Sequence, residues 1–195
     1  MALKPIACLI TDRRRLPEPT VPAIVRQVRR AAAAGVQLVQ IRERDLEGRP
    51  LFALVRLLVE TVSGTATRIV VNDRLDVALA AGAHGVHLRS SSFAASRTRE
   101  VVPAGFLIGR SVHFSDDVSA VSRGADFVLF GNVYETSSKS GLAAAGLSRL
   151  AEVARATSVP VLAVGGVSLE RIPEVLEAGA VGFGAISMFS EPAGQ

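Results

Sequence analysis

The sequence has one cysteine, one tyrosine and no tryptophan, and these shortages exclude several classes of protein. The single thiol, Cys8, has no partner for a disulfide within the chain, and its place in an apolar stretch favours a reducing compartment. No apolar run is long enough to form a membrane-spanning helix. Residues 1–5 lead directly into an apolar stretch and do not resemble a signal peptide. We therefore expect a cytoplasmic protein with no membrane partner.

Lysine is also nearly absent, since Lys4 and Lys139 are the only two, so most of the positive charge is carried by arginine. The arginines are spread along the chain among acidic residues, and Arg13-Arg14-Arg15 is their only cluster. A nucleic-acid-binding surface usually needs a basic stripe with aromatic residues between the charges. We interpret the cluster as a solvated loop or a loop on the phosphate side of a site, and expect no nucleic-acid partner.

The chain alternates short apolar stretches with segments of helical periodicity, which predicts an α/β fold. Its 195 residues suit a single domain. Strands are predicted at residues 6–11, 36–41, 68–71, 85–88, 106–114, 127–133, 160–164 and 182–186. Helices are predicted at residues 23–34, 51–62, 75–81, 96–102, 117–122, 148–157 and 169–177.

Eight such units predict a single (β/α)8 TIM barrel over residues 1–195. Few residues follow the eighth predicted strand, so a missing or truncated last helix stays open. The alternative is an open, doubly wound sheet. We favour the barrel because no Gly-x-Gly-x-x-Gly turn follows a strand, and because polar residues end nearly every strand.

The stretch at residues 106–114 is the clearest candidate for a functional strand. Its apolar start is followed by Ser111 and His113, a hydroxyl and an imidazole at the carboxyl end of the strand. In a barrel, all strand carboxyl ends meet at one face, which carries the active site. That face would gather Asp12, Gln40, Arg42, Arg44, Asn72, Asp73, His87, Ser111, His113, Asn132, Thr136, Lys139, Gly165, Gly166 and Ser187.

Two groups of these residues predict anion binding. Gly165-Gly166 and Ile186-Ser187 follow the last two strands, the usual phosphate position of this fold, where glycine lets backbone N–H groups approach an anion. A simple tight turn is the alternative. Arg42 and Arg44 are two residues apart on a strand and share a face, where two guanidiniums favour an anion. Ion pairs with Glu43, Asp45 or Asp73 are a second explanation for the two arginines.

At these positions the chain resembles the thiamine phosphate synthase superfamily. The family's motifs are Gln-x-Arg-x-Lys, Asn-Asp, Val-His-x-Gly-Gln-x-Asp, Gly-x-Ser-x-His, Thr-x-x-Lys and Gly-Gly, in this order along the strands. The corresponding segments here are Gln40-Ile41-Arg42-Glu43-Arg44, Asn72-Asp73, Val86-His87-Leu88-Arg89-Ser90-Ser91-Ser92, Gly109-Arg110-Ser111-Val112-His113, Thr136-Ser137-Ser138-Lys139 and Gly165-Gly166. The resemblance covers nearly the whole chain.

The departures from the motifs favour one branch of the superfamily. The synthases hold Mg²⁺–pyrophosphate with two aspartates, but only Asp73 remains, because Ser92 takes the place of the second. Loss of a carboxylate ligand should weaken Mg²⁺ binding. Several segments, including residues 108–113 and 126–136, instead resemble the TenI-like thiazole tautomerases. The Glu-Gly-Arg-Gly that follows the loop in that branch is Ala-Ala-Ala-Gly at residues 143–146.

The resemblance implies a thiazole tautomerase of thiamine biosynthesis, an isomerase that needs no metal and no other cofactor. It implies His113 as the acid–base residue that moves a proton on a carboxylated thiazole phosphate and makes the ring aromatic. His87 is expected to be structural. The expected phosphate-binding residues are Gly165, Gly166, Ile186 and Ser187. The expected substrate-binding residues are Gln40, Arg42, Arg44, Asn72, Asp73, Ser111, Thr136, Ser138 and Lys139.

Two other functions stay open at this point. One is a thiamine phosphate synthase, a transferase that joins hydroxymethylpyrimidine pyrophosphate and thiazole phosphate and would use Mg²⁺. The other is a catalytically silent, regulatory TenI paralogue that binds ligand without turnover. In each case the partner is a small thiazole phosphate, and a homodimer is also left open.

Overall fold

The computed structural model of the protein describes residues 4–113, 117–136 and 143–189. Its eight strands follow one another around a closed, parallel barrel in the order of the sequence, as the alternating pattern predicts. The strands are β1 (Ile6–Ile10), β2 (Leu38–Ile41), β3 (Arg68–Asn72), β4 (Gly85–Leu88), β5 (Leu107–Val112), β6 (Phe127–Phe130), β7 (Val161–Val164) and β8 (Gly182–Ala185). All residues of β2, β4, β6 and β8 are buried, as expected for parallel strands covered by helices.

The helices lie where the periodicity of apolar residues places them. They are α1 (Val21–Ala33), α2 (Gly48–Thr61), α3 (Leu75–Ala80), α4 (Ala95–Arg99), α5 (Val118–Ser122), α6 (Gly146–Ala156) and α7 (Ile172–Glu177). In α1 the side chain of Thr20 accepts a hydrogen bond from the Ala23 backbone N–H at 3.3 Å and caps the helix. Its buried face includes Ile24 and Val28, the two positions that the sequence pattern selected.

The sequence pattern placed several element boundaries wrongly. The helix predicted at 169–177 is a 3-10 turn, η3 (Leu169–Arg171), followed by α7. Pro173 explains the break, because it has no N–H to donate to the carbonyl of Leu169. Strand β5 is shorter than the predicted 106–114, so His113 lies one residue beyond its end. Strand β6 ends at Phe130 and not at residue 133.

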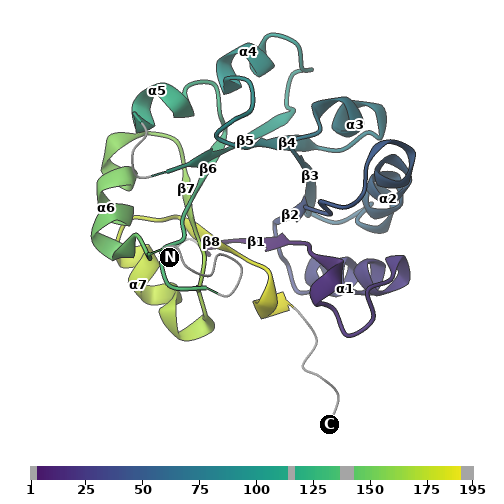
Figure 1. Ribbon diagram of the computed structural model, residues 1–195, viewed down its shortest axis with the longest axis horizontal. Coiled ribbons are helices and arrows are strands. Elements are labelled where there is room, and N and C mark those ends of the chain that lie inside the picture. The colour runs from purple at the N-terminus through teal and green to yellow at the C-terminus, as the bar shows by residue number, and fades with distance from the viewer. Residues whose placement is uncertain (1–3, 114–116, 137–142, 190–195) are drawn as a thin grey trace. The chain divides into compact units, whose positions relative to one another are not determined.

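The chain forms two compact units. One comprises residues 1–7 and 88–185, and the other residues 8–87 and 186–195. In the first, α4 to α7 lie outside β5 to β8, and in the second, α1 to α3 lie outside the neighbouring strands (Figure 1). The single domain over residues 1–195 and the homodimer stay predictions. After β8 the described chain contains only η4 (Ser187–Phe189), and the question of an eighth helix falls outside the described residues.

Within the first unit, the start of β1 is hydrogen-bonded to the residue that precedes β8. The Ile6 backbone N–H donates to the Val181 carbonyl at 3.0 Å. Gly182 lies so close to the same strand that a Cβ atom there would overlap the carbonyl oxygen of Ile6. Glycine at this position is therefore a requirement of barrel closure.

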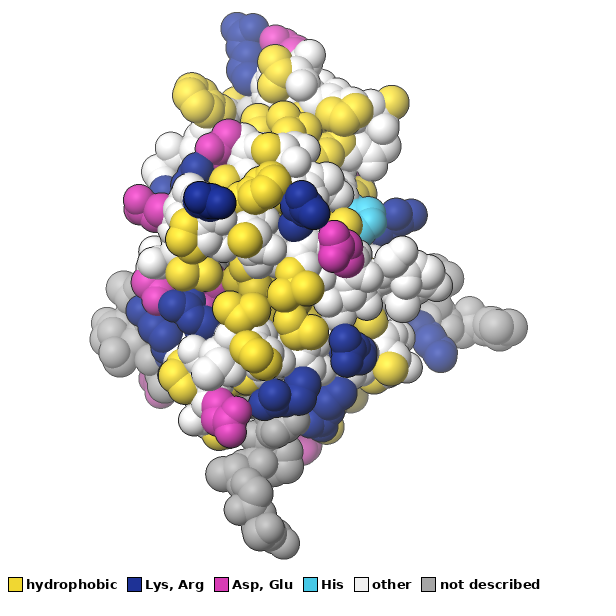
Figure 2. Space-filling view, turned by 90° about the vertical axis from the view of Figure 1, so that its right-hand side faces the viewer, with side chains coloured by type: hydrophobic (Ala, Val, Ile, Leu, Met, Phe, Trp, Pro, Cys, Tyr) yellow, Lys and Arg dark blue, Asp and Glu magenta, His cyan; other side chains and the backbone are white. Residues whose placement is uncertain are grey.

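None of the helices in the described part of the chain is both long and apolar enough to cross a bilayer. On the face that carries α1, α2 and α3, Lys and Arg side chains are scattered among acidic and apolar ones (Figure 2).

Candidate functional site

In the second unit, the carboxyl ends of β1 and β2 are held together beyond the strands themselves. The backbone N–H of Thr11 donates to the Gln40 carbonyl at 2.9 Å. The Thr11 hydroxyl then accepts the backbone N–H of Arg42 at 3.0 Å. Because Thr11 is completely buried, this bridge fixes Asp12 and Arg42 at the ends of neighbouring strands. The candidate anion-binding residues of β2 are thereby tied to the Arg13-Arg14-Arg15 turn, η1 (Arg13–Arg15).

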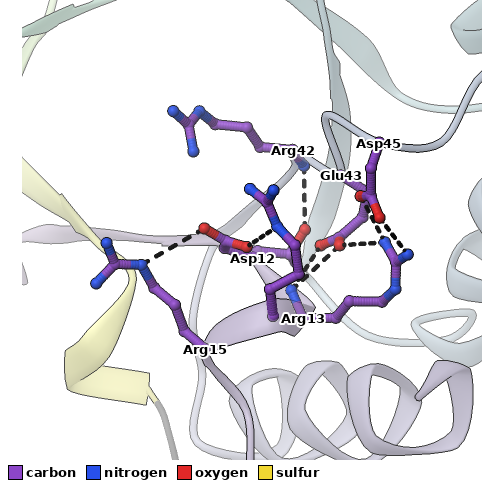
Figure 3. A network of polar contacts seen from close by, with 8 residues as sticks. Asp12, Arg13, Arg15, Arg42, Glu43 and Asp45 are labelled. Carbon is purple, nitrogen blue, oxygen red and sulfur yellow. Dashed lines mark hydrogen bonds and ion pairs between the residues drawn. The ribbon is translucent and has the colours of Figure 1, made fainter. Parts of the chain in front are cut away.

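Arg13 holds this turn against the segment after β2 (Figure 3). Its backbone N–H donates to both carboxylate oxygens of Glu43, at 3.2 and 3.1 Å, and its Nη1 donates to Glu43 Oε2 at 3.0 Å. The guanidinium also binds both oxygens of Asp45, at 2.8 and 2.6 Å. The hydrogen bond to Asp45 raises the pKa of Arg13, and the same bond lowers the pKa of Asp45. The Glu43 side chain is fully buried, so Arg13 supplies the charge that its carboxylate needs.

The ion pairs that sequence reasoning offered as an explanation for Arg42 and Arg44 are therefore made by a different residue. Among the residues that the structure describes, neither Arg42 nor Arg44 has a carboxylate within ion-pair distance. Arg42 is half-buried and Arg44 is exposed. Burial lowers the pKa of Arg42, and the positive charge of Arg44 lowers it further. Both arginines stay available to a bound anion.

The remaining predicted residues of this unit lie along β2, β3 and β4. Gln40 is buried in β2, and its backbone pairs in register with Ile10 and Val70. Asn72 ends β3 opposite His87 of β4. Asp73 follows with a φ of 65°, and its backbone N–H donates to the His87 carbonyl at 2.9 Å. His87 is 2% exposed, as suits the structural role expected of it.

In the first unit, Ser111 lies in β5 and His113 directly follows the strand, and both side chains are half-buried. Because β5 ends at Val112, the alternation of strand faces on which the sequence grouped the two residues does not extend to His113. Arg110, between Gly109 and Ser111, is 5% exposed and was not singled out by sequence reasoning. It donates to the carbonyls of Ser90 (3.1 Å), Ser92 (3.3 Å) and Phe93 (2.8 Å), and so fixes the loop that follows β4. Only the fold could reveal this role, because the partners lie up to 20 residues away.

The glycine pair after β7 contacts the segment that follows β6. Both glycines have positive φ, 90° for Gly165 and 67° for Gly166. A Cβ on Gly165 would lie 2.6 Å from the Cβ of Asn132, and one on Gly166 would lie 2.6 Å from the Glu135 carbonyl oxygen. Packing alone thus requires glycine at both positions, whether or not a phosphate binds there.

The loop expected to supply Thr136, Ser138 and Lys139 is described only in part. Thr136 is half-buried, whereas Ser138 and Lys139 lie outside the described residues. The base of the loop is anchored, because the backbone N–H of Ala145 donates to the Asn132 carbonyl at 2.9 Å. Ile186 and Ser187 directly follow β8, and Ser187 is exposed.

A hollow of about 310 Å³ lies elsewhere in the second unit, beside α1. None of the predicted site residues lines it. Its walls come from Leu16, Pro17, Glu18, Ala23, Arg26, Gln27, Arg30, Ala31, Ala34, Met188 and Phe189.

The profile of the family described as thiamine monophosphate synthase matches residues 7–189, nearly the whole chain. The chain belongs to the thiamine monophosphate synthase family. A putative thiamine-phosphate synthase of Geobacter sulfurreducens is 42% identical over 181 residues, which are 92% of this chain and 84% of the relative. The thiamine-phosphate synthase of Methanoculleus marisnigri is 40% identical over 161 residues, 82% of this chain and 76% of the relative.

A solved structure agrees with this assignment. Thiamine phosphate pyrophosphorylase from Pyrococcus furiosus superposes with a TM-score of 0.80 at 31% identity, covering 95% of this chain and 88% of that one. The protein is therefore an enzyme of thiamine biosynthesis, and the expected family is confirmed. The two curated relatives carry the synthase's name and the solved structure carries that of the pyrophosphorylase; none of the three is named for the TenI branch.

Proposed function

We propose that the chain catalyses the thiamine-phosphate synthase reaction, which joins hydroxymethylpyrimidine pyrophosphate to a thiazole phosphate. The observation that carries this proposal is the 42% identity to a putative synthase over 92% of the chain. It is preferred to the tautomerase, because relatives that are 42% and 40% identical to this chain bear the synthase's name. The acid–base role of His113 becomes part of the second candidate function.

In this reaction the bond between the pyrimidine's methylene carbon and pyrophosphate breaks, and pyrophosphate leaves with the bonding electrons. The thiazole nitrogen forms the new bond to that carbon. Negative charge grows on the departing pyrophosphate, so preorganised cations lower the barrier. Arg42 and Arg44 are suited to this task, because guanidiniums bind phosphate oxygens through two parallel hydrogen bonds. For the phosphate of the thiazole, the expected residues are Gly165 and Gly166 in the first unit and Ile186 and Ser187 in the second.

The Mg²⁺ that the resemblance implies for a synthase does not fit the residues present. Ser92 cannot contribute charge, and its Oγ accepts the Arg89 backbone N–H at 2.8 Å. In the described ranges, no three His, Cys, Asp or Glu side chains gather in a geometry that could hold a metal ion. Asp73 alone is a weak site for an ion that prefers several hard oxygen ligands. We assign no step to a metal.

A thiazole tautomerase is the second candidate, and the same Ser92 substitution favours it. In this reaction a base removes the ring proton and an acid returns one to the exocyclic carbon, so that the ring becomes aromatic. His113 could perform both steps, since imidazole exchanges protons near neutral pH. Ser111, two residues earlier, could orient the ring or the substrate.

Two assays on the purified chain separate these functions. With the pyrimidine pyrophosphate and thiazole phosphate together, we expect thiamine phosphate to form and pyrophosphate to be released. With the non-aromatic carboxylated thiazole tautomer alone, we expect no acceleration of aromatisation. The reverse result would replace the synthase with the tautomerase, and turnover in neither assay would favour the silent regulatory paralogue.

The variant His113→Asn adds a second criterion. Asparagine keeps some hydrogen bonding but cannot carry the proton. If the chain is a tautomerase, kcat on the tautomer falls by about 10²–10⁴-fold while KM changes little. If it is a synthase, thiamine phosphate formation loses much less, because no proton transfer by this residue is required.

A further inference from the structure

The turn η1, which precedes α1, brings the positive charges of Arg14 and Arg15 to the region where β2 ends. The family motifs do not include these two residues. Arg14 Nε donates to Asp12 Oδ1 at 3.2 Å, and Arg15 Nε lies 3.5 Å from Asp12 Oδ2. Figure 3 shows the side chains of Arg15 and Arg42 extending on either side of the Asp12 carboxylate. One carboxylate with a 10% exposed side chain thus serves two guanidiniums of the turn.

Residues 12–15 and 42–45 of the second unit together carry more positive than negative charge. Burial lowers the pKa of Arg42, the positive charges of Arg44, Arg14 and Arg15 lower it further, and the negative charge of Asp12 opposes this shift. Glu43 and Asp45 do not restore the balance, because both are bound to Arg13. Within these two segments five guanidiniums stand against three carboxylates: Arg13, Arg14, Arg15, Arg42 and Arg44 against Asp12, Glu43 and Asp45.

The turn is also held in place independently of any ligand. Thr11 bridges to Arg42, and Arg13 is bound to the buried Glu43, so Arg14 and Arg15 start from a fixed backbone. Prearranged donors lose less freedom on binding than donors on a free loop. A fixed group of like charges lowers its energy when a multiply charged anion enters.

We propose that Arg14 and Arg15 extend the Arg42–Arg44 site into a diphosphate-binding site in which arginine supplies the positive charge that the missing carboxylate-bound Mg²⁺ would otherwise provide. This proposal deepens the proposed function and rests on it, because the synthase reaction identifies the ligand as the pyrophosphate group of the substrate. A single carboxylate or phosphate would leave part of the charge unmatched. The site therefore favours diphosphate over monophosphate.

The test measures the binding of inorganic pyrophosphate to the whole chain by calorimetry in the presence of EDTA. We expect binding without metal, and an excess of Mg²⁺ should change Kd by no more than about threefold, because arginine already offsets the charge of the anion. Inorganic phosphate should bind at least about tenfold more weakly than pyrophosphate, since it engages fewer guanidiniums. Binding of pyrophosphate by the unaltered chain only when Mg²⁺ is present would overturn the proposal.

The double variant Arg14→Ala with Arg15→Ala tests the turn itself. Loss of two charge-assisted contacts should raise Kd for pyrophosphate by at least about tenfold. The matched control, Arg56→Ala with Arg97→Ala, removes the same charge from exposed helix positions and should leave Kd within about twofold, because screening weakens distant charges. Equal Kd values for the two double variants would mean that Arg14 and Arg15 only neutralise Asp12.

Circular dichroism checks that the variants fold. If the double variant does not fold, each single variant is measured in its place, with an expected rise in Kd of about threefold or more.

Because these binding measurements involve no turnover, their failure can be distinguished from a failure of the proposed synthase function. Metal-free pyrophosphate binding that depends on Arg14 and Arg15 supports the site even in a chain without synthase activity.

Discussion

Glu43→Gln tests whether burial makes the contact with Arg13 important for stability. The Glu43 side chain is 0% exposed and accepts the Arg13 backbone N–H and one guanidinium N–H, at 3.0 to 3.2 Å. Breaking a buried ion pair by removing one partner costs about 3–5 kcal/mol. Glutamine can still accept one hydrogen bond, and Arg13 keeps Asp45. We therefore expect the lower end of that range, about 3 kcal/mol.

Asp45→Asn is a closely matched control. It makes the same chemical change at a carboxylate that binds the same guanidinium, but the Asp45 side chain is 39% exposed. Water can replace part of the interaction there, so the expected loss is about 0–1 kcal/mol. The comparison holds the partner residue and the substitution type constant. The two sites differ in burial and in the Arg13 backbone N–H, which only Glu43 accepts.

Thermal unfolding followed by circular dichroism gives the measurement. In a chain of this length each kcal/mol corresponds to about 2–4 °C in Tm, so Glu43→Gln should lower Tm by roughly 6–12 °C. Asp45→Asn should lower it by at most about 4 °C. Equal shifts in the two variants would refute the argument, because they would show that burial does not decide the contribution of these carboxylates.

Three further outcomes are expected. Gly182→Ala should lower Tm by at least about 2–4 °C through overpacking, because its Cβ would overlap the Ile6 carbonyl oxygen. Gly182 does not have a positive φ, so backbone strain adds nothing, and an unchanged Tm would contradict the packing argument. Burial raises the pKa of Cys8 to about 12, so iodoacetamide should label the unfolded chain at pH 8 but not the folded one; rapid labelling of folded protein would contradict this. Burial and, to a smaller extent, the positive charge of Arg68 lower the pKa of His84, so its contribution to stability is present above pH 6.5 and is lost as pH falls through the folded pKa. In urea unfolding, the free energy of unfolding of His84→Asn should therefore fall less steeply toward acid pH than that of the unaltered chain. An equally steep fall in both proteins would exclude His84 as its cause.

Some site residues could be identified from the sequence because their relation is local. Arg42 and Arg44 are two residues apart, as are Ser111 and His113, so the sequence grouped each pair on one strand face. That reason was wrong for the arginines, because β2 ends at Ile41 and Arg44 lies in a turn, and His113 lies one residue beyond the end of β5. Their positions at the ends of strands also follow from the alternation of apolar and helical segments. The roles of these residues in binding and catalysis stay predictions.

Other features depended on contacts between distant segments. Sequence reasoning considered Glu43 and Asp45 as partners of Arg42 and Arg44, but Arg13, 30 and 32 residues away, binds both. It attributed Gly165 and Gly166 to phosphate binding or a tight turn, whereas the segment after β6 leaves no room for a Cβ at either position. Arg110 was overlooked because its partners are backbone carbonyls, which leave no signature in the sequence.

The sequence alone determined the eight-stranded parallel barrel, through the order and periodicity of its apolar segments. It also indicated the family, through its resemblance to the family's motifs. The tertiary structure decided which charges are paired and which arginines remain for a ligand. The physical reason is the range of the interactions: periodic burial is set by near neighbours, whereas ion pairing depends on which strand ends the fold brings within a few ångströms of one another.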